Sequence, residues 1–152
     1  MKNIFIAICL ITFFVCCKKD KFTTAPQIEY ISIIPNATSI SLGSAIPILT
    51  FSITDKEGDI GLKPGVDTSY VYLVNNLTGK SDSLPFPNLR DAAKSNFKGD
   101  VSVSISSVLE CKSLPSGALH TDTLYFNVYV MDFDRNKSNV FTTGEPVYFT
   151  CR

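Results

Sequence analysis

The segment DTLYFNVYVMD, residues 122–132, alternates strongly apolar with more polar side chains. A period of two is typical of a β-strand that buries one face and exposes the other. The segment therefore predicts a strand with one face in a hydrophobic core and one face toward solvent. The predicted inner face carries Leu124, Phe126, Val128 and Val130, opposite Tyr125, Asn127 and Tyr129.

The same period recurs along the rest of residues 27–152, with turn residues between the runs. Short alternating runs at this spacing favour two packed sheets. We therefore expect an all-β fold, a single β-sandwich of about seven antiparallel strands. The further predicted strands are QIEYISII (27–34), IPILTFSIT (46–54), TSYVYLVNN (68–76), DVSVSISSVLEC (100–111) and EPVYFTC (145–151).

The order of these runs resembles an immunoglobulin-like domain, with strands A, B, C, a short edge strand, E, F and G. The resemblance covers residues 27–152 and is limited to the strand pattern, because the chain has no tryptophan to match the buried one of antibody domains. It implies that the loop after strand B and the loop after strand F emerge at the same end of the sandwich.

The first residues, MKNIFIAICLITFFVCCKKD, place Lys2 before an apolar run that is too short to cross a bilayer comfortably. The run ends in Cys16-Cys17, which resembles the signal peptide of a bacterial lipoprotein. The resemblance implies a signal peptide over 1–16, lipid on Cys17 with Cys16 as the second choice, and a polar tether over 17–26. A cleaved secretory peptide and an uncleaved anchor are the alternatives.

Asp20 lies three residues after Cys17 and not next to it. In the sorting rule of such lipoproteins, an aspartate directly after the lipidated cysteine is associated with retention in the inner membrane. The resemblance therefore implies an outer-membrane protein held by its lipid, and it leaves open which face of that membrane the domain occupies.

Two of the five cysteines, Cys111 and Cys151, remain once the signal segment is set aside. Both have the inward phase of their predicted strands, and an exported domain lies where disulfides persist. We expect a Cys111–Cys151 disulfide, which would stabilise the fold by roughly 4 kcal/mol through chain entropy. Two buried free thiols are the alternative.

Acidic side chains crowd two predicted turns, DKEGDIG (55–61) and DFDRNKSN (132–139). The first is similar to turns of cadherin-like and PKD-like repeats, and the second to a turn of bacterial immunoglobulin-like modules. Calcium prefers six to eight oxygen ligands, so the two turns could form a calcium site. The sequence favours the other interpretation, a structural turn whose acids are neutralised by a salt bridge from Arg135. The candidate ligands are Asp55, Glu57, Asp59, Asp132, Asp134 and Asn136.

Charge and motifs argue against several functional classes. The chain carries 14 basic and 14 acidic residues, so a nucleic-acid partner is not expected. Hydrolase elbows, zinc helices and phosphate loops are absent from the sequence. With one histidine, His120, and two cysteines expected in a disulfide, zinc lacks ligands. We expect no cofactor and no catalysis, and calcium is the one metal that the two turns could hold.

The expected function is a non-catalytic envelope lipoprotein, either an adhesion module or an accessory subunit of a complex with a protein partner. The alternative is a glycan-binding accessory protein for nutrient uptake, which a row of exposed tyrosines would favour. A glycoside-acting enzyme is the third class and would need a cleft that gathers carboxylates. The tripeptides around Ser83 and Thr123 resemble O-glycosylation sequences of some bacteria.

Overall fold

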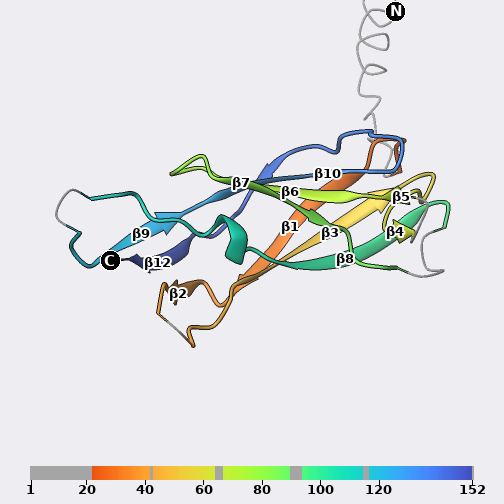
Figure 1. Cartoon of the computed structure of the whole chain (residues 1–152). Helices are drawn as coiled ribbons and strands as arrows, with labels where there is room; N and C mark the ends of the chain where they lie inside the picture. Colours follow the sequence, from red (N-terminus) through yellow and green to blue (C-terminus); the bar gives the residue numbers. More distant parts are fainter. Residues whose placement is uncertain (1–21, 42, 64–66, 90–93, 115–116, 152) are drawn as a thin grey trace, which may run out of the picture.

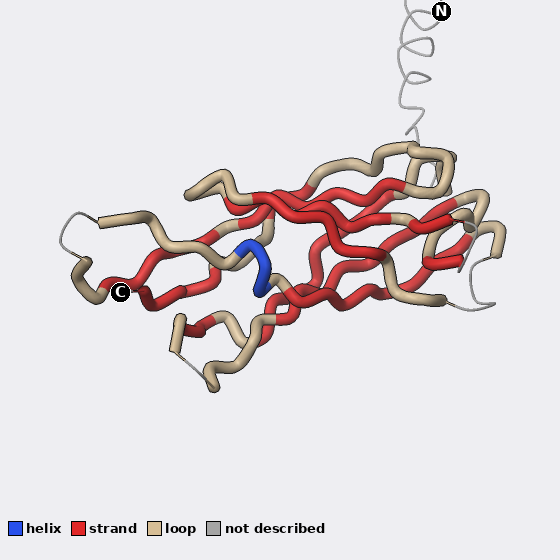
Figure 2. The backbone as a smooth tube through the Cα atoms, in the orientation of Figure 1, coloured by secondary structure: helices blue, strands red, loops and turns tan. Residues whose placement is uncertain are grey.

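The computed structural model describes residues 22–41, 43–63, 67–89, 94–114 and 117–151, and this part of the chain is all-β. Its strands form sheets of three, four, three and two strands (Figures 1 and 2). Within these residues, no helix is long and apolar enough to cross a bilayer. The all-β class expected from the sequence is therefore confirmed.

The first sheet has the strand order β1-β3-β8, and both neighbouring pairs are antiparallel. Phe51 in the middle of β3 pairs with Tyr30 on one side and Val101 on the other. Every second residue of β3 points inward and is buried, as the alternation of the sequence predicts. The bounds are β1 (Gln27–Ile34), β3 (Ile48–Asp55) and β8 (Phe97–Ser104).

The second sheet has the strand order β11-β10-β6-β7, again with antiparallel neighbours. Val128 of β10 pairs with Leu73 of β6, and both side chains are fully buried. Tyr129 and Tyr72 form the next pair and point to the other face. The bounds are β6 (Tyr70–Asn75), β7 (Ser81–Pro85), β10 (Phe126–Met131) and β11 (Phe141–Thr142).

The inner faces of these two sheets form one hydrophobic core. Phe51 of the first sheet and Phe141 of the second approach with their ring centroids 6.1 Å apart. Burial of such apolar faces is the main favourable contribution to folding. The largest fully buried side chains include Phe51, Phe86, Phe126, Leu49, Ile53, Ile60, Leu73, Ile105 and Leu124.

A third sheet, of order β2-β12-β9, extends the molecule at the end where the chain terminates (Figure 1). The β12–β9 pair is antiparallel, whereas β2 runs parallel to β12. The parallel pair was not predicted. The bounds are β2 (Ala37–Ser39), β9 (His120–Leu124) and β12 (Val147–Cys151), and a separate small hairpin joins β4 (Leu62–Lys63) to β5 (Asp67–Thr68).

Two predicted strands are shorter than expected. The run 122–132 divides at Tyr125 into β9 and β10, which belong to different sheets, although the alternation of buried residues continues through the break. The run 100–111 leaves its sheet after Ser104 and forms a 3₁₀ turn, η2 (Ser106–Val108). Periodicity reports which side chains are buried and does not report which strand is the partner.

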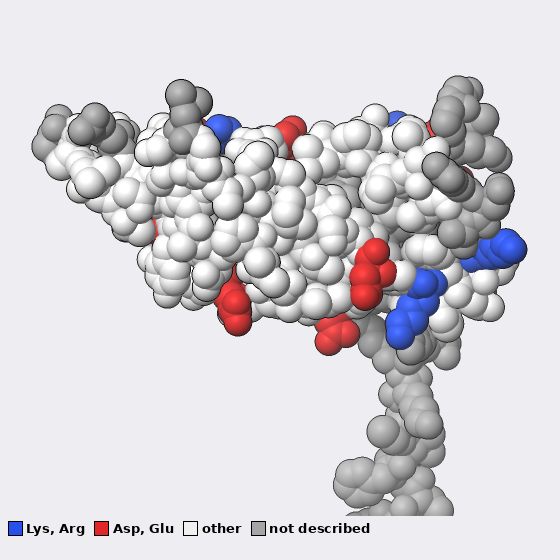
Figure 3. Space-filling view, turned by 90° about the horizontal axis from the view of Figure 1, so that it is seen from below, with Lys and Arg blue, Asp and Glu red and all other residues white. Residues whose placement is uncertain are grey.

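The disulfide predicted between Cys111 and Cys151 is confirmed, with the Cα atoms 5.9 Å apart. Cys151 ends β12, whereas Cys111 lies in an extended segment after η2 and not in a strand. On the face that Figure 3 displays, acidic and basic side chains are scattered among uncharged residues. That face therefore carries no concentrated field of one sign.

Candidate functional site

Two loops meet where β3 and β10 end, and we call residues 55–61 and 132–138 together the rim. The main-chain N–H of Phe133 donates a hydrogen bond of 3.0 Å to the carbonyl oxygen of Asp59. The loops are far apart in the sequence, so this bond and the shared end of the two sheets bring them together.

The alternation of the strands carries two acidic residues inward at the rim. Asp55 is the last residue of β3 and has the inward phase of Ile53. Asp132 follows the last residue of β10 and has the inward phase of Val130. Asp55 is 0% exposed and Asp132 is 3% exposed, so two carboxyl groups lie in positions that the pattern gives to apolar side chains.

Three carboxyl groups converge at the rim. One carboxylate oxygen from each of Asp55, Asp59 and Asp132 lies within 4.8 Å of the other two. Asp59 is half-buried, and it approaches from the loop after β3. We call these residues the aspartate cluster.

Hydrogen bonds from the loops hold two members of the aspartate cluster in place. The Gly58 N–H donates to Oδ1 of Asp55 at 2.5 Å. Asn136 donates twice to Asp132, from its main-chain N–H to Oδ1 at 2.7 Å and from its side-chain amide to Oδ2 at 2.9 Å. Each loop therefore folds back onto the carboxylate that begins it.

Two other oxygens of the cluster are buried without a hydrogen-bond partner among the described residues, namely Oδ2 of Asp55 and Oδ1 of Asp59. A buried polar atom that lacks a partner costs about 1–3 kcal/mol, and more when it carries charge. Buried polar groups are nearly always satisfied in native proteins, so a water, an ion or a shared proton is needed at these two oxygens.

Gly58 is required by the shape of the first loop. Its φ is 71°, in the left-handed region that glycine adopts readily. A Cβ at this position would collide with the main-chain carbonyl of Lys94. The glycine of the predicted Asp-x-x-Gly turn therefore both donates to Asp55 and permits a close approach of another segment.

The pKa values of two carboxyl groups in the aspartate cluster are raised. Burial raises the pKa of the Asp55 carboxyl to about 7, and the hydrogen bond from Gly58 opposes this rise. The charge of Asp59, a hydrogen bond between the Asp55 and Asp59 carboxyl groups when Asp55 is protonated, and the charge of Asp132 add to it. Burial also raises the pKa of Asp132, and the two hydrogen bonds from Asn136 oppose that rise. A proton or a cation near these oxygens would relieve the repulsion among the carboxylates.

The donor set is suited to a hard divalent cation. Calcium binds carboxylate, carbonyl and water oxygens at about 2.3–2.6 Å in flexible geometry. Oδ2 of Asp55 and Oδ1 of Asp59 are free to coordinate, and Asp132 lies within reach of both. The residues therefore fit a calcium ion whose remaining ligands would be main-chain carbonyls and water.

The other candidate ligands are not part of the cluster. Glu57 and Asp134 are exposed, and Glu57 accepts a hydrogen bond of 3.3 Å from the Thr24 hydroxyl. Asn136 uses its side-chain amide to donate to Asp132. The structure thus brings together three of the six predicted calcium ligands. Asn136 is not one of these three, and it holds Asp132 in place by hydrogen bonds.

Arg135 is exposed and has a φ of 68°. In the described part of the chain, the ion pairs join Lys80 to Glu110 and His120 to Asp122, and Arg135 is in neither. Its main-chain N–H donates to the carbonyl oxygen of Asp132 at 3.3 Å. Among the described residues, the Arg135 guanidinium therefore forms no ion pair with the aspartate cluster.

A row of tyrosines lies on the outer face of the second sheet. The rings of Tyr72 and Tyr129 stack with centroids 4.6 Å apart and an interplanar angle of 5°. The other face of Tyr129 is covered by the Lys137 ammonium, 3.9 Å from the ring centroid, and Tyr70 packs at a tilt beside Tyr72. Because sugar stacking needs open ring faces, this row is less suited to it than its exposure suggests.

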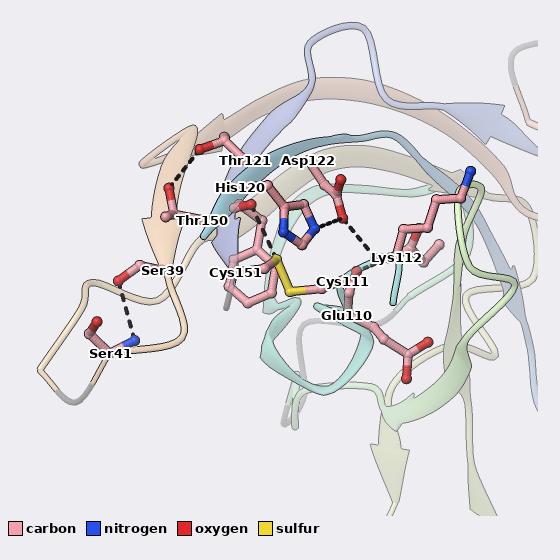
Figure 4. The surroundings of a disulfide bond; sticks show 12 residues. Ser39, Ser41, Glu110, Cys111, Lys112, His120, Thr121, Asp122, Thr150 and Cys151 are labelled. Atoms are coloured by element: carbon pink, nitrogen blue, oxygen red, sulfur yellow. Dashed lines mark hydrogen bonds and ion pairs between the residues drawn. A yellow bond between two sulfur atoms is a disulfide. The ribbon is translucent and has the colours of Figure 1, made fainter. Parts of the chain in front are cut away.

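Around the disulfide, the structure gathers residues that the sequence did not connect. Figure 4 shows His120 and Asp122 of β9 beside the bond between Cys111 and Cys151. His120 pairs directly with Cys151 across the β9–β12 ladder. The inward phase of β9 was visible in the sequence, but its pairing with β12 was not.

A cavity of about 570 Å³ opens next to the disulfide, between β2, the loop after it and the segment that follows η2. Among the described residues that line it, Glu110 is the acidic one. Hydrolysis of a glycoside uses two carboxyl groups on either side of the bond. The cavity therefore does not supply the pair that this chemistry requires.

Some predicted residues lie outside the described part of the chain or away from the rim. Cys17 and Cys16 fall outside the described residues. Ser83 lies in β7 and Thr123 in β9, and both are exposed. Their exposure makes both hydroxyls accessible, which modification would require.

Comparison with known proteins returns no matching family model, no matching curated protein and no matching solved structure. Function must therefore be inferred from the residues themselves.

Proposed function

We propose that the protein is a non-catalytic lipoprotein of the bacterial outer membrane whose immunoglobulin-like domain binds calcium at the aspartate cluster. The observation that carries the proposal is the convergence of three carboxyl groups with two buried, unpartnered oxygens, Oδ2 of Asp55 and Oδ1 of Asp59. A bound calcium ion would replace the missing hydrogen bonds and neutralise the charge.

The strand order supports the immunoglobulin-like assignment. The sheets β1-β3-β8 and β11-β10-β6-β7 correspond to the orders A-B-E and G-F-C-C′ that such a domain would have. The parallel β2–β12 pair fits a first strand that continues from one sheet to the other. The assignment also explains why the loops after β3 and β10 share one end.

The contact between the tether and the rim supports a role close to the membrane. The Lys56 N–H donates to the Thr23 carbonyl oxygen at 3.3 Å, and Thr24 contacts Glu57. Thr23 is six residues after Cys17, which spans at most about 20 Å of extended chain. The rim is then the end nearest the membrane, and calcium would stiffen the joint between the tether and the domain.

In this orientation the opposite end of the domain would face away from the membrane. That end carries the third sheet (Figure 1). The disulfide joins β12 of this sheet to the segment after η2, and the cavity lies next to it. The proposed role is therefore to present this end to a protein partner, as an adhesion module or as an accessory subunit. Glycan binding has weaker support because the ring faces of Tyr72 and Tyr129 cover each other.

Isothermal titration of calcium into the full chain in detergent tests the proposal. We expect one site with a dissociation constant of about 10⁻⁴–10⁻³ M, as in other extracellular modules. Asp59→Asn should remove the binding, because it neutralises the half-buried ligand without changing its size. Glu57→Gln is the matched control from the same loop and should bind as the wild type does; equal loss in both variants would contradict the proposed site.

A further inference from the structure

We propose that the Cys111–Cys151 disulfide is one state of a redox-controlled zinc site, which Asp122 and His120 complete when the disulfide is reduced. This inference concerns the end of the molecule opposite the rim and does not depend on calcium binding or on the lipid anchor. Its ligand atoms come from β9, from β12 and from the segment after η2.

The register of the third sheet places the ligands on one face. His120 pairs with Cys151, and Asp122 pairs with Phe149. Residues two apart share a face of a strand, and directly opposite residues have their Cβ atoms about 4.5–5.5 Å apart. His120, Asp122 and Cys151 therefore project to the same side, where the segment that contains Cys111 lies against them (Figure 4).

Three of the four ligand atoms lie together, and the histidine adjoins them beside the carboxylate. The Sγ atoms of Cys111 and Cys151 and one carboxylate oxygen of Asp122 lie within 4.8 Å of one another. Nε2 of His120 is 3.5 Å from Oδ2 of Asp122. Zinc binds nitrogen and oxygen at about 2.0–2.2 Å, so two such ligands in a tetrahedron are about 3.4 Å apart.

The histidine is already held as a metal ligand would be. Its Nδ1 lies 2.9 Å from the Ala118 carbonyl oxygen, which favours the tautomer with the proton on Nδ1. Its Nε2 is buried and has no hydrogen-bond partner among the described residues. Nε2 faces Oδ2 of Asp122 at 3.5 Å, so a cation that displaces the proton between them would be bound by both groups.

The carboxylate is oriented as well. Oδ2 of Asp122 accepts a hydrogen bond of 2.7 Å from the Lys112 N–H, next to Cys111 in the chain. Supporting hydrogen bonds of this kind fix ligands around zinc. In the described residues around the disulfide, Lys112 is exposed and Glu110 pairs with Lys80, so neither side chain competes for the site.

The switching step is a thiol–disulfide exchange with an external dithiol. The dithiol's thiolate attacks Sγ of Cys111, which is half-buried, and the thiolate of Cys151 leaves. The second thiol of the donor then releases Cys111, so the donor ends as a disulfide and the protein as a dithiol. Zinc binding afterwards releases the remaining thiol protons to water.

The test measures metal binding by the full chain before and after reduction with a phosphine, under argon and after removal of the reductant. Cobalt(II) is the probe, because tetrahedral thiolate coordination gives strong visible absorption and a thiolate-to-metal charge-transfer band. We expect one equivalent of cobalt in the reduced protein, displaced by one equivalent of zinc, and no such absorption in the oxidised protein.

Variants assign the ligands. Cys111→Ser/Cys151→Ser keeps Cys9, Cys16 and Cys17 and therefore measures the background from those thiols. Asp122→Asn and His120→Ala should each weaken zinc binding by at least about tenfold. Glu110→Gln, a neighbouring acid outside the ligand set, is the control and should leave the affinity unchanged.

The proposal is overturned if the reduced protein binds no more cobalt than Cys111→Ser/Cys151→Ser, including the case in which reduction unfolds the chain. It is also overturned if both Asp122→Asn and His120→Ala bind zinc as tightly as the wild type. Circular dichroism of each variant before and after reduction reports whether the chain stays folded, so a signal lost in a folded variant reports the site itself.

Discussion

The main-chain N–H of Phe133 donates to the carbonyl oxygen of Asp59 at 3.0 Å and joins the two loops of the rim. Asp59 thus contributes its carbonyl group to loop docking and its carboxylate to the aspartate cluster. A change in the shape of either loop should therefore alter both the stability of the domain and the spacing of the carboxylates.

Gly58→Ala should destabilise the domain more than an ordinary glycine replacement. Gly79 has a similar φ of 77° with open space around it, so Gly79→Ala reports the backbone strain alone, about 1–2 kcal/mol. Gly58→Ala adds the collision with the Lys94 carbonyl and should cost more by about 1–3 kcal/mol. Urea unfolding of the two variants measures the difference, and equal costs would contradict the described loop packing.

As the pH rises from about 4 to about 7, the free energy of unfolding of the metal-free protein should decrease. The pKa of Asp55 is raised from 3.8 to about 7 in the folded chain, so the native state binds more protons than the unfolded state in that window. The raised pKa of Asp132 acts in the same direction. Urea unfolding in EDTA at pH 5 and pH 8 gives the two free energies of unfolding.

Asp55→Asn identifies the residue responsible. The variant cannot titrate at this position, so its stability should vary less between pH 5 and pH 8 than that of the wild type. Asp100→Asn, an exposed acid on β8, is the control and should keep the full dependence. The account of the rim fails if the wild type becomes more stable toward pH 8 in EDTA, or if Asp55→Asn retains the same slope.

The tyrosine row should behave as a structural pair and not as a sugar platform. A double-mutant cycle of Tyr72→Ala and Tyr129→Ala should give a coupling energy of about 0.5–1.5 kcal/mol, because the rings stack face to face. Tyr125→Ala, exposed and between β9 and β10, should not couple to either. Saturable binding of a neutral oligosaccharide that is lost in Tyr72→Ala would instead favour the glycan-binding alternative.

Lipid attachment should depend on Cys17. In a Gram-negative host fed an alkyne analogue of palmitate, the wild type and Cys16→Ser should be labelled and sediment with the outer membrane. Cys17→Ser should be unlabelled. Labelling of Cys17→Ser together with loss in Cys16→Ser would move the anchor to Cys16, and no labelling in any form would contradict the lipoprotein assignment.

Most of the core could be predicted from alternation. The buried residues of β10 are those on the predicted inner face, and β3 and β6 bury every second residue in the same way. The partners of short strands could not be predicted, because β2 and β11 have only three and two residues. Their positions depend on long-range pairing with β12 and β10, which local periodicity does not encode.

The candidate sites were partly predictable for the same reason. Asp55 and Asp132 follow inward-facing positions, so their phase indicates burial, while Glu57 and Asp134 project to solvent from the turns. The disulfide was predicted from an odd-numbered phase through Cys111, although the strand ends at Ser104. The pairing is correct because the segment after η2 lies against β9, where the Lys112 N–H donates to Asp122, and the sequence does not reveal this contact.

Calcium binding at the aspartate cluster is tested by thermal unfolding of the full chain in EDTA, in about 10 mM calcium and in the same concentration of magnesium. With an affinity of 10⁻⁴–10⁻³ M, calcium should stabilise the domain by about 1.4–2.7 kcal/mol. For a domain of this size the transition should move upward by roughly 3–10 °C. The account predicts that this shift is absent with magnesium and lost in Asp59→Asn. The same transition temperature in EDTA and in calcium would contradict it and leave the three carboxylates without a cation.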